Sequence, residues 1–359
     1  MADVQPFRAV RYAGAAGSLA DLVAPPYDTV TDDERARLLA RSPYNVAHLT
    51  LPDSAEKAGR LYGDWLAAGV LEPEAMVSAW LLVESFVGPD GVAGERRGVV
   101  ASVRAEPYAA RGVLPHERTH PHVREERVAL LRAMRAQPEP VFLLHEAGPV
   151  PDVPERAPDL SVDGSRLWRI DADVGSFGDQ ELLVADGHHR YESALELGYE
   201  LGPSGARIMA LLVSTADPGL HVFPTHRTFS TRPDLAALGE GETCASLAEA
   251  LARLALEPFE RSAAVAYRSA GVELLRGREG ELDVELVDRH GLDGIGYTAQ
   301  LDEAVAAVDG GEADVAFLVR HPRVEDVFAT ARRGRLMPQK STYFFPKPLS
   351  GLLFHPLEP

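Results

Sequence analysis

The chain has 359 residues, 45% of them hydrophobic and 25% charged, which is the composition of an ordinary globular protein. Its formal net charge of −18 weighs against a general nucleic-acid binder, and no apolar run approaches the roughly 20 residues that span a bilayer. The single cysteine, Cys244, excludes an intrachain disulfide and a cysteine-based metal cage, and a terminus without an apolar signal segment favours the cytoplasm.

The predicted elements mix helices and strands along the whole chain, which indicates an α/β or mixed α+β class. In residues 1–145, an expected N-terminal α/β lobe, Thr31 and Glu34 form a capping-box pattern for a helix through Ala40. The other elements expected there are a helix over 54–68 that ends at Gly69, a hairpin of strands 79–87 and 98–104, a helix over 124–135 and a strand over 141–144.

Residues 146–232 form the second expected segment and residues 233–359 a C-terminal α/β lobe, the three acting as one catalytic unit. In the second segment an apolar strand over 181–185 leads through a turn into a helix from His188 to Leu197, with Gly198 just beyond its end. The other expected elements are a strand over 207–214, a helix over 245–254, a hairpin around Gly280, a helix over 302–308, a strand over 315–319 and a helix over 322–333.

The strongest candidate site is the run Asp186-Gly187-His188-His189-Arg190, which follows a buried strand and opens a helix. A helix N-terminus offers free backbone N–H groups and a positive dipole end to an anion, and the histidines and arginine add donors suited to phosphate. Packing alone does not explain so many ionisable side chains after an apolar strand. The run therefore predicts a phosphate-handling site, although a simple helix cap at Asp186 and a buried structural histidine are the plainer explanations for single members.

The segment from Asp186 to Leu195 resembles the signature of a bacterial family known only as a domain of unknown function, numbered ten-fifteen. Further matching segments follow in the family's order and span nearly the whole chain: 24–28, 115–119, 224–227 and 337–343. Residues 186–190 are also similar to the phosphate-binding turn of the ParB/sulfiredoxin-like superfamily. That group includes nucleotide-dependent partition proteins, sulfiredoxins and kinases of free L-serine, so the resemblance implies a ParB/sulfiredoxin-like core with additional α/β lobes.

The resemblance implies phosphoryl transfer by a kinase of free L-serine or a similar small hydroxyl metabolite, with pyrophosphate, ATP or ADP as the phosphate donor and Mg²⁺ as cofactor. Such transfer needs mainly positioning and charge neutralisation. The expected donor-binding residues are Gly187, His188, His189, Arg190, Arg118, Lys340, Ser341, Thr342 and Lys347. The expected catalytic carboxylates are Glu117, Asp186 and Asp28; Glu117 or Asp28 would take the hydroxyl proton, and Asp186 would hold the metal.

Residues 116–120 have the spacing of a zinc-protease motif, in which a helix places two histidines on one face. Proline follows His120, and a residue before proline is disfavoured in the helical region, so His120 is not expected to be helical. We therefore expect Glu117 to be a base or magnesium ligand and Arg118 to bind phosphate. A salt-bridged loop is the alternative explanation.

Lysine is rare in this chain, since Lys57, Lys340 and Lys347 are the only three among 36 basic residues. Lys340-Ser341-Thr342 lacks the glycine-rich cradle of a phosphate-binding Walker loop. These side chains are therefore expected to close over phosphate from a loop, with the ammonium groups as compact point charges.

Substrate binding has four further candidates: Tyr27, which lies in a stiff Pro-Pro turn, and His116, His226 and Arg227. A turn or a surface pair explains them equally well. Cys244 stands at a predicted helix start, where a capping or packing role is expected.

Two other functions also fit the sequence. One is a nucleotide-binding switch or scaffold related to partition proteins, without turnover of a small molecule. The other is a metal-dependent hydrolase that uses His116 and His120. The sequence leaves the phosphate donor, the acceptor and the oligomeric state open, and it favours a small-molecule partner over nucleic acid or membrane.

Overall fold

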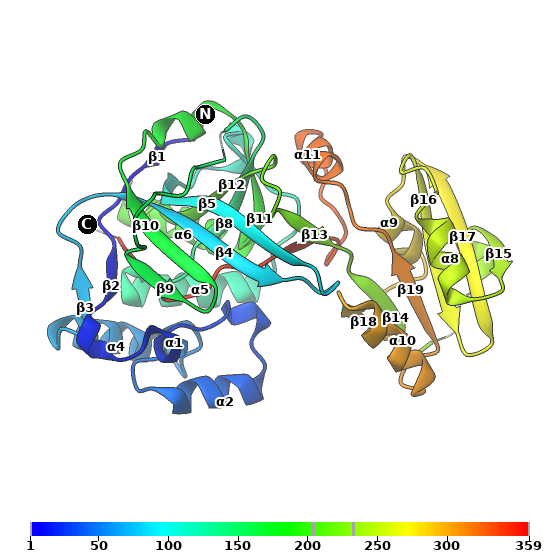
Figure 1. The fold of residues 1–359 in the computed structure, drawn as a ribbon, viewed down its shortest axis with the longest axis horizontal. Helices are drawn as coiled ribbons and strands as arrows, with labels where there is room; N and C mark the ends of the chain where they lie inside the picture. The colour runs from blue at the N-terminus through cyan, green and yellow to red at the C-terminus, as the bar shows by residue number, and fades with distance from the viewer. Residues whose placement is uncertain (1, 149, 203–204, 232–233, 358–359) are drawn as a thin grey trace.

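The structure is a computed structural model that describes residues 2–148, 150–202, 205–231 and 234–357. The chain builds a large lobe first, crosses to a smaller lobe and returns (Figure 1). Because the last segment returns to the large lobe, residues from both ends of the sequence meet there.

The large lobe contains a nine-stranded sheet with the order β6-β11-β8-β12-β5-β4-β10-β9, and β1 pairs with β5. Its pairs are antiparallel except β6 with β11 and β8 with β12, which are parallel. The strands are β1 (Val4–Gln5), β4 (Ala79–Val87), β5 (Ala93–Arg104), β6 (Val113–Leu114), β8 (Val141–His145), β9 (Leu160–Val162), β10 (Ser165–Ile170), β11 (Leu182–Asp186) and β12 (Arg207–Ser214).

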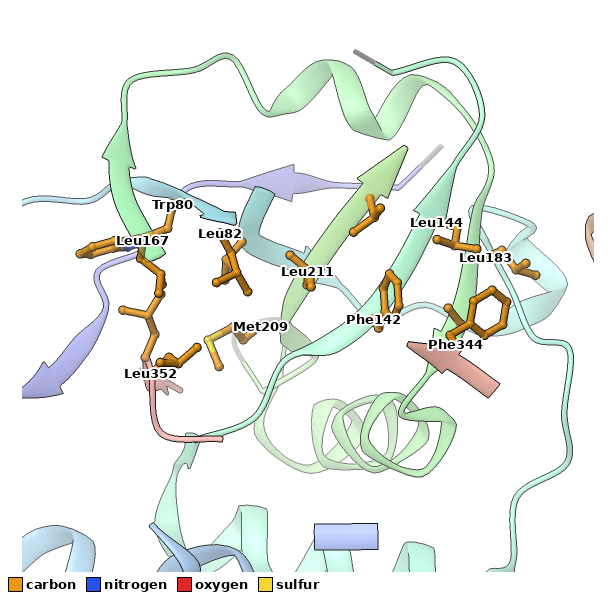
Figure 2. Close-up of a cluster of buried hydrophobic side chains, with 14 of the residues drawn as sticks. Trp80, Leu82, Phe142, Leu144, Leu167, Leu183, Met209, Leu211, Phe344 and Leu352 are labelled. Atoms are coloured by element: carbon orange, nitrogen blue, oxygen red, sulfur yellow. The ribbon is translucent and has the colours of Figure 1, made fainter. Parts of the chain in front are cut away.

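Both faces of this sheet are buried, as the apolar runs of β8, β11 and β12 require. On one face lie α5 (Pro121–Met134) and α6 (His188–Leu201), which contributes Tyr191 and Leu197 to the core. On the other face lie α11 (Val324–Arg332) and the returning C-terminal segment. Figure 2 shows Phe344 and Leu352 of that segment among the side chains of the sheet, so the tail completes the core.

Short helices near the N-terminus form a third apolar cluster at the edge of the large lobe (Figure 1). Phe354 from the C-terminal segment is fully buried in it and makes an edge-to-face contact with Tyr12, with ring centroids 5.5 Å apart. The elements are β2 (Val10–Tyr12), α1 (Leu19–Leu22), α2 (Asp32–Arg41), α3 (Ala47–Thr50), α4 (Ala55–Ala67) and β3 (Leu71–Pro73), with β7 (Ala136–Gln137) paired to β21 (His355–Pro356) nearby.

The small lobe is a six-stranded antiparallel sheet with the order β15-β17-β16-β19-β14-β18. Between the lobes, β13 (His221–Phe223) pairs with β20 (Tyr343–Phe345). The elements of the small lobe are β14 (His226–Phe229), α7 (Leu235–Leu238), β15 (Glu240–Cys244), α8 (Leu247–Leu254), β16 (Arg261–Arg268), β17 (Gly271–Glu279), α9 (Asp283–Asp288), β18 (Ile295–Thr298), α10 (Leu301–Asp309) and β19 (Val315–Val319).

The predicted mixed α/β class is confirmed, and several elements match their predicted bounds closely. α2 begins with the predicted capping box: the Thr31 hydroxyl accepts from the Glu34 N–H, and the Glu34 carboxylate accepts from the Thr31 N–H. β12 and β19 have the predicted bounds. In the part of the chain that the structure describes, no helix is both long and apolar enough to cross a membrane.

Two local predictions were wrong. α6 continues past Gly198 to Leu201. Gly198 does not end the helix; it lies inside it at a point where Ala206 packs closely, and a Cβ on Gly198 would lie 2.4 Å from the Cβ of Ala206. The hairpin of the small lobe turns before Gly271, between β16 and β17, and Gly280 follows its second strand. The predicted 145/146 boundary runs through one sheet, since β8 lies between β11 and β12.

We expect Phe354→Ala to lower the free energy of unfolding by about 3–5 kcal/mol, because it empties a fully buried aromatic site. Chemical denaturation followed by tryptophan fluorescence measures this loss. Leu256→Ala is the control, since that side chain is 85% exposed and its truncation should change stability by less than about 0.5 kcal/mol. An equal effect of the two substitutions would contradict the role of the tail in the core.

Candidate functional site

A cleft of about 1130 Å³ opens between the two lobes, slightly larger than the pockets of roughly 300–1,000 Å³ that hold single small-molecule ligands. It is lined by the β11–α6 turn, the short 3-10 helix Tyr27–Thr29, residues 117–120, the C-terminal segment from Gln339 to Lys347, and β18 with the start of α10. In Figure 1, β18 lies on the side of the small lobe that faces the large lobe. Segments from five parts of the sequence therefore meet in one cavity.

The β11–α6 turn positions the N-terminus of α6 at this cleft. Gly187 has a φ of 92°, in the left-handed region that favours glycine, and a Cβ on it would lie 3.0 Å from Nε and Nη2 of Arg190. Among the described residues no side chain caps α6, so its first backbone N–H groups are available to a ligand. The local sequence thus creates an anion-binding helix terminus at the end of a buried strand.

Ion pairs run through the floor of the cleft. The Lys347 ammonium lies 2.8 Å from Oδ1 of Asp186 and 2.8 Å from Oδ2 of Asp28. The other carboxylate oxygen of Asp186 lies 2.6 Å from Nη2 of Arg190, whose Nη1 donates to the carbonyl of Pro140. Asp186, Arg190 and Lys347 are each more than four-fifths buried, so these pairs are shielded from solvent.

The pairing fixes the charge of each group. Burial alone would raise the pKa of Asp186, but Lys347 and Arg190 outweigh it and hold that pKa well below its usual value. Burial would lower the pKa of Lys347, but Asp186 and Asp28 outweigh it and raise that pKa. Asp186 therefore stays ionised at neutral pH and is a weak base.

The predicted magnesium role of Asp186 does not fit this arrangement, because both of its oxygens already contact cationic side chains. Within residues 2–148, 150–202, 205–231 and 234–357, no group of three or more His, Cys, Asp and Glu side chains is arranged to hold a metal ion. His116 and His120 make other contacts, with Thr342 and Gln339 respectively. The geometry consequently gives no support to a metal-dependent hydrolase.

The two histidines of the turn are held by backbone amides of residues 116–120. Nε2 of His188 accepts from the His116 N–H at 3.3 Å, and Nε2 of His189 accepts from the His120 N–H at 2.9 Å. Burial, and then the neighbouring His120, lower the pKa of His189 to about 4; burial and then His116 lower the pKa of His188 as well. Both rings are therefore neutral at pH 7 and carry their proton on Nδ1, which leaves each with one donor.

Glu117, Arg118 and Lys340 line the cleft without ion pairs among the described residues. Oε1 of Glu117 accepts from the backbone N–H of Lys340 at 3.2 Å, which leaves its other oxygen available. Lys340 has a φ of 54°, so the chain turns sharply at this contact. These residues give the cleft one carboxylate and two cations without ion pairs, and the carboxylates of Glu34 and Glu303, which accept from Thr31 and Thr298, line it as well.

The structure also brings Tyr27 and Asp28 to the cleft. The Arg127 guanidinium lies over the Tyr27 ring at 4.2 Å, and the Tyr27 N–H donates to Oε1 of Glu139 at 3.1 Å. Glu139 is buried and also accepts from the Ser350 hydroxyl, so it ties the Tyr27 turn to the C-terminal segment.

Four of the predicted site residues do not line the cleft: His116, Ser341, His226 and Arg227. The Ser341 hydroxyl is buried and donates to the Pro338 carbonyl, and Nδ1 of His226 accepts from the Val319 N–H. Arg227 is fully buried, pairs with Asp288 at 3.3 Å and donates to the Gln339 carbonyl. Arg227 therefore lies outside the cleft and contacts the segment that carries Lys340.

Several cleft residues were not predicted. The small lobe contributes Tyr297, Thr298, Gln300 and Glu303, and the large lobe contributes Thr31 and Glu34. No local pattern marks them as site residues: those of the small lobe reach the cleft only through the packing of the two lobes, and Thr31 and Glu34 show only the capping-box pattern of α2. Glu139, which supports the Tyr27 turn without lining the cleft, did have a signal, since Pro138 and Pro140 flank this glutamate.

The model of the family described as "Protein of unknown function (DUF1015)" matches residues 4–301 of this chain. No curated protein is detectably similar in sequence.

Solved structures offer distant likenesses, each of which aligns with 68% of this chain. A conserved hypothetical protein from Pyrococcus furiosus is 18% identical over 90% of its own length, with a TM-score of 0.42. A free serine kinase in complex with AMP is 15% identical over 86% of its length, with a TM-score of 0.40. A C-terminally truncated SbnI from Staphylococcus aureus is 15% identical over 84% of its length, with a TM-score of 0.44.

Lys347→Met should lower the free energy of unfolding at neutral pH by about 3 kcal/mol, because it leaves Asp186 and Asp28 without their shared ammonium. The folded-state pKa of Asp186 is lowered, so its stabilising effect is complete above the unfolded pKa of about 4 and is lost as the pH falls below it. The difference between variant and wild type should therefore shrink in acid.

Denaturation at neutral and acidic pH measures this effect. Lys57→Met is the matched control, because the Lys57–Asp53 pair is exposed and its loss should change stability little at any pH. A Lys347 variant that behaves like the Lys57 variant would show that the buried pair contributes nothing.

Proposed function

The chain belongs to the DUF1015 family, and we propose that it is a phosphotransferase that moves a phosphoryl group from a nucleotide or pyrophosphate to a small hydroxyl metabolite. The observation that carries the proposal is the meeting, in one cleft, of an uncapped helix N-terminus, the two unpaired cations Arg118 and Lys340, and the carboxylate of Glu117. These are the parts that phosphoryl transfer requires: anion binding, charge neutralisation and a group to take a proton.

Donor phosphates would bind at the N-terminus of α6. The first backbone N–H groups and the helix dipole favour an anion there, and the Nδ1–H groups of His188 and His189 add donors. Arg118 and Lys340 supply positive charge that no carboxylate of the described residues neutralises. The Asp186–Lys347–Asp28 pairs hold this floor in place and do not bind the donor themselves.

Glu117 is the group that we propose takes the proton of the attacking hydroxyl. Its Oε1 is fixed by the Lys340 amide, and its second oxygen is available in the cleft. Asp28 and Asp186 are poorer bases, because the Lys347 ammonium contacts both. The distances therefore favour Glu117 among the predicted catalytic carboxylates.

Free L-serine is our first candidate for the acceptor. The similarity of residues 186–190 to the phosphate-binding turn of a superfamily that includes kinases of free L-serine supports this choice. The cleft also has room for a nucleotide and a small amino acid together, since its volume of about 1130 Å³ exceeds that of most single-ligand pockets.

Phosphorus NMR of the protein with L-serine, Mg²⁺ and either ATP, ADP or pyrophosphate tests the reaction. We expect a new phosphomonoester signal with one donor, and Glu117→Gln should lower the rate by about 10²–10⁴-fold because it removes the proton acceptor. A raised melting temperature with nucleotide but no product from any acceptor would instead indicate a nucleotide-binding switch. Undiminished turnover of the glutamine variant would remove Glu117 from the mechanism.

Arg118→Gln should raise the KM of the phosphate donor by about 10-fold or more, because it removes a charge-assisted hydrogen bond to phosphate. The KM of the acceptor should not change. Steady-state kinetics with each substrate varied in turn measures both constants. Arg278→Gln, an exposed arginine of β17, is the control; a similar effect of both variants would point to general charge rather than to a phosphate contact.

A further inference from the structure

The hydrogen bonds of His116 fix which of its ring nitrogens carries the proton. Nδ1 lies 2.6 Å from the carbonyl oxygen of Val184, and Nε2 lies 2.9 Å from the hydroxyl oxygen of Thr342. A carbonyl oxygen can only accept, so Nδ1 must carry the hydrogen that is shared with Val184.

The second ring nitrogen of His116 carries no proton. The side chain is 1% exposed and packs edge-to-face on His188, with ring centroids 4.7 Å apart. Burial lowers the pKa of His116, and a charged ring there would also lie against the buried His188. Nε2 therefore has a lone pair, and the hydrogen of the contact must come from Thr342.

The direction of this bond determines what Thr342 offers to the cleft. A hydroxyl has one hydrogen and two lone pairs, and the hydrogen of Thr342 is already donated to His116. Thr342 lines the cleft, and its oxygen keeps only lone pairs, so it cannot donate to a phosphate oxygen. This differs from the expectation from the sequence, which placed Thr342 among the residues that bind the phosphate donor.

The neighbouring groups have the opposite polarity. The N-terminal amides of α6, the Nδ1–H groups of His188 and His189, Arg118 and Lys340 are all hydrogen-bond donors. Phosphates would be bound by these groups, whereas a group that itself donates would be bound by Thr342. The cleft thus offers hydrogen-bond donors to phosphate and, at Thr342, an acceptor to a hydroxyl or ammonium group.

We infer that Thr342 binds the phosphoryl acceptor, through the hydroxyl or the ammonium group of a small hydroxy amino acid, and that His116 is the positioning residue that orients Thr342. This inference rests on the proposed function. It adds the location of the acceptor: beside Thr342, next to Glu117, which follows His116 in the chain and accepts from the amide of Lys340.

Thr342→Val tests the inference, because valine has the same shape and lacks the oxygen. We expect the KM of L-serine to rise about 10- to 100-fold while the KM of the phosphate donor stays unchanged. Thr342→Ser should restore the wild-type KM, since it keeps the hydroxyl. Thr243→Val, on the exposed side of β15, is the control for the substitution itself. A rise in the KM of the donor, or no change in either constant, would overturn the inference.

A second acceptor, 3-hydroxypropionate, shows which group of serine contacts Thr342, because it has the hydroxyl of serine and no ammonium group. The penalty of the valine variant should disappear with this acceptor if Thr342 binds the ammonium and persist if it binds the hydroxyl.

Calorimetric titration of L-serine into the protein without donor separates this inference from the proposed reaction. Weaker binding by Thr342→Val than by wild type would support the acceptor site even if no transfer occurs. Equal binding by the two proteins, or no binding by wild type, would overturn it.

Discussion

The cleft depends on one buried ammonium group. Lys347 contacts Asp28, 319 positions earlier in the chain, and Asp186 at the turn before α6. Burying a charge is costly unless it is paired, so the three segments can only be buried together. The Asp186–Arg190 pair then fixes the first turn of α6 beside Gly187. Because Lys347 lies on the returning tail, the charges of the anion-binding turn are fully paired only when the C-terminal segment is in place.

The polarity of the site follows from backbone groups rather than from the side chains alone. The amides of His116 and His120 each donate to a histidine of the α6 turn, and the carbonyl of Val184 accepts from the His116 ring. Each backbone contact decides which ring nitrogen keeps its proton. Residues 116–120 have the spacing of a zinc-protease motif, but their effect here is different. Their backbone amides fix the protonation of the two histidines at the start of α6 through hydrogen bonds.

The sequence predicted the parts of the fold that local chemistry determines. The capping box of α2, the glycine turn before α6 and the apolar runs of β12 and β19 depend on neighbouring residues, and they formed as expected. Gly198 misled because its close contact with Ala206 is tertiary. For the site, ionisable residues in unusual settings, such as the rare Lys347, pointed to residues that the structure places at the cleft. His226 and Arg227 looked similar but are buried supports, and Tyr297 reaches the cleft only because two lobes meet.

A strongly acidic chain can still attract an anionic ligand if its free positive charge is concentrated in one place. Many arginines elsewhere form salt bridges within the body of a lobe. Examples are Arg320 with Asp283, Arg276 with Glu257 and Arg96 with Glu84. Arg118 and Lys340 lie at the cleft without such partners among the described residues. Since a paired cation contributes little field at a distance, Arg118 and Lys340 would add to the positive end of α6, although carboxylates such as Glu34 and Glu303 line other parts of the same cleft. The net charge of −18 therefore describes the surface as a whole and not the site.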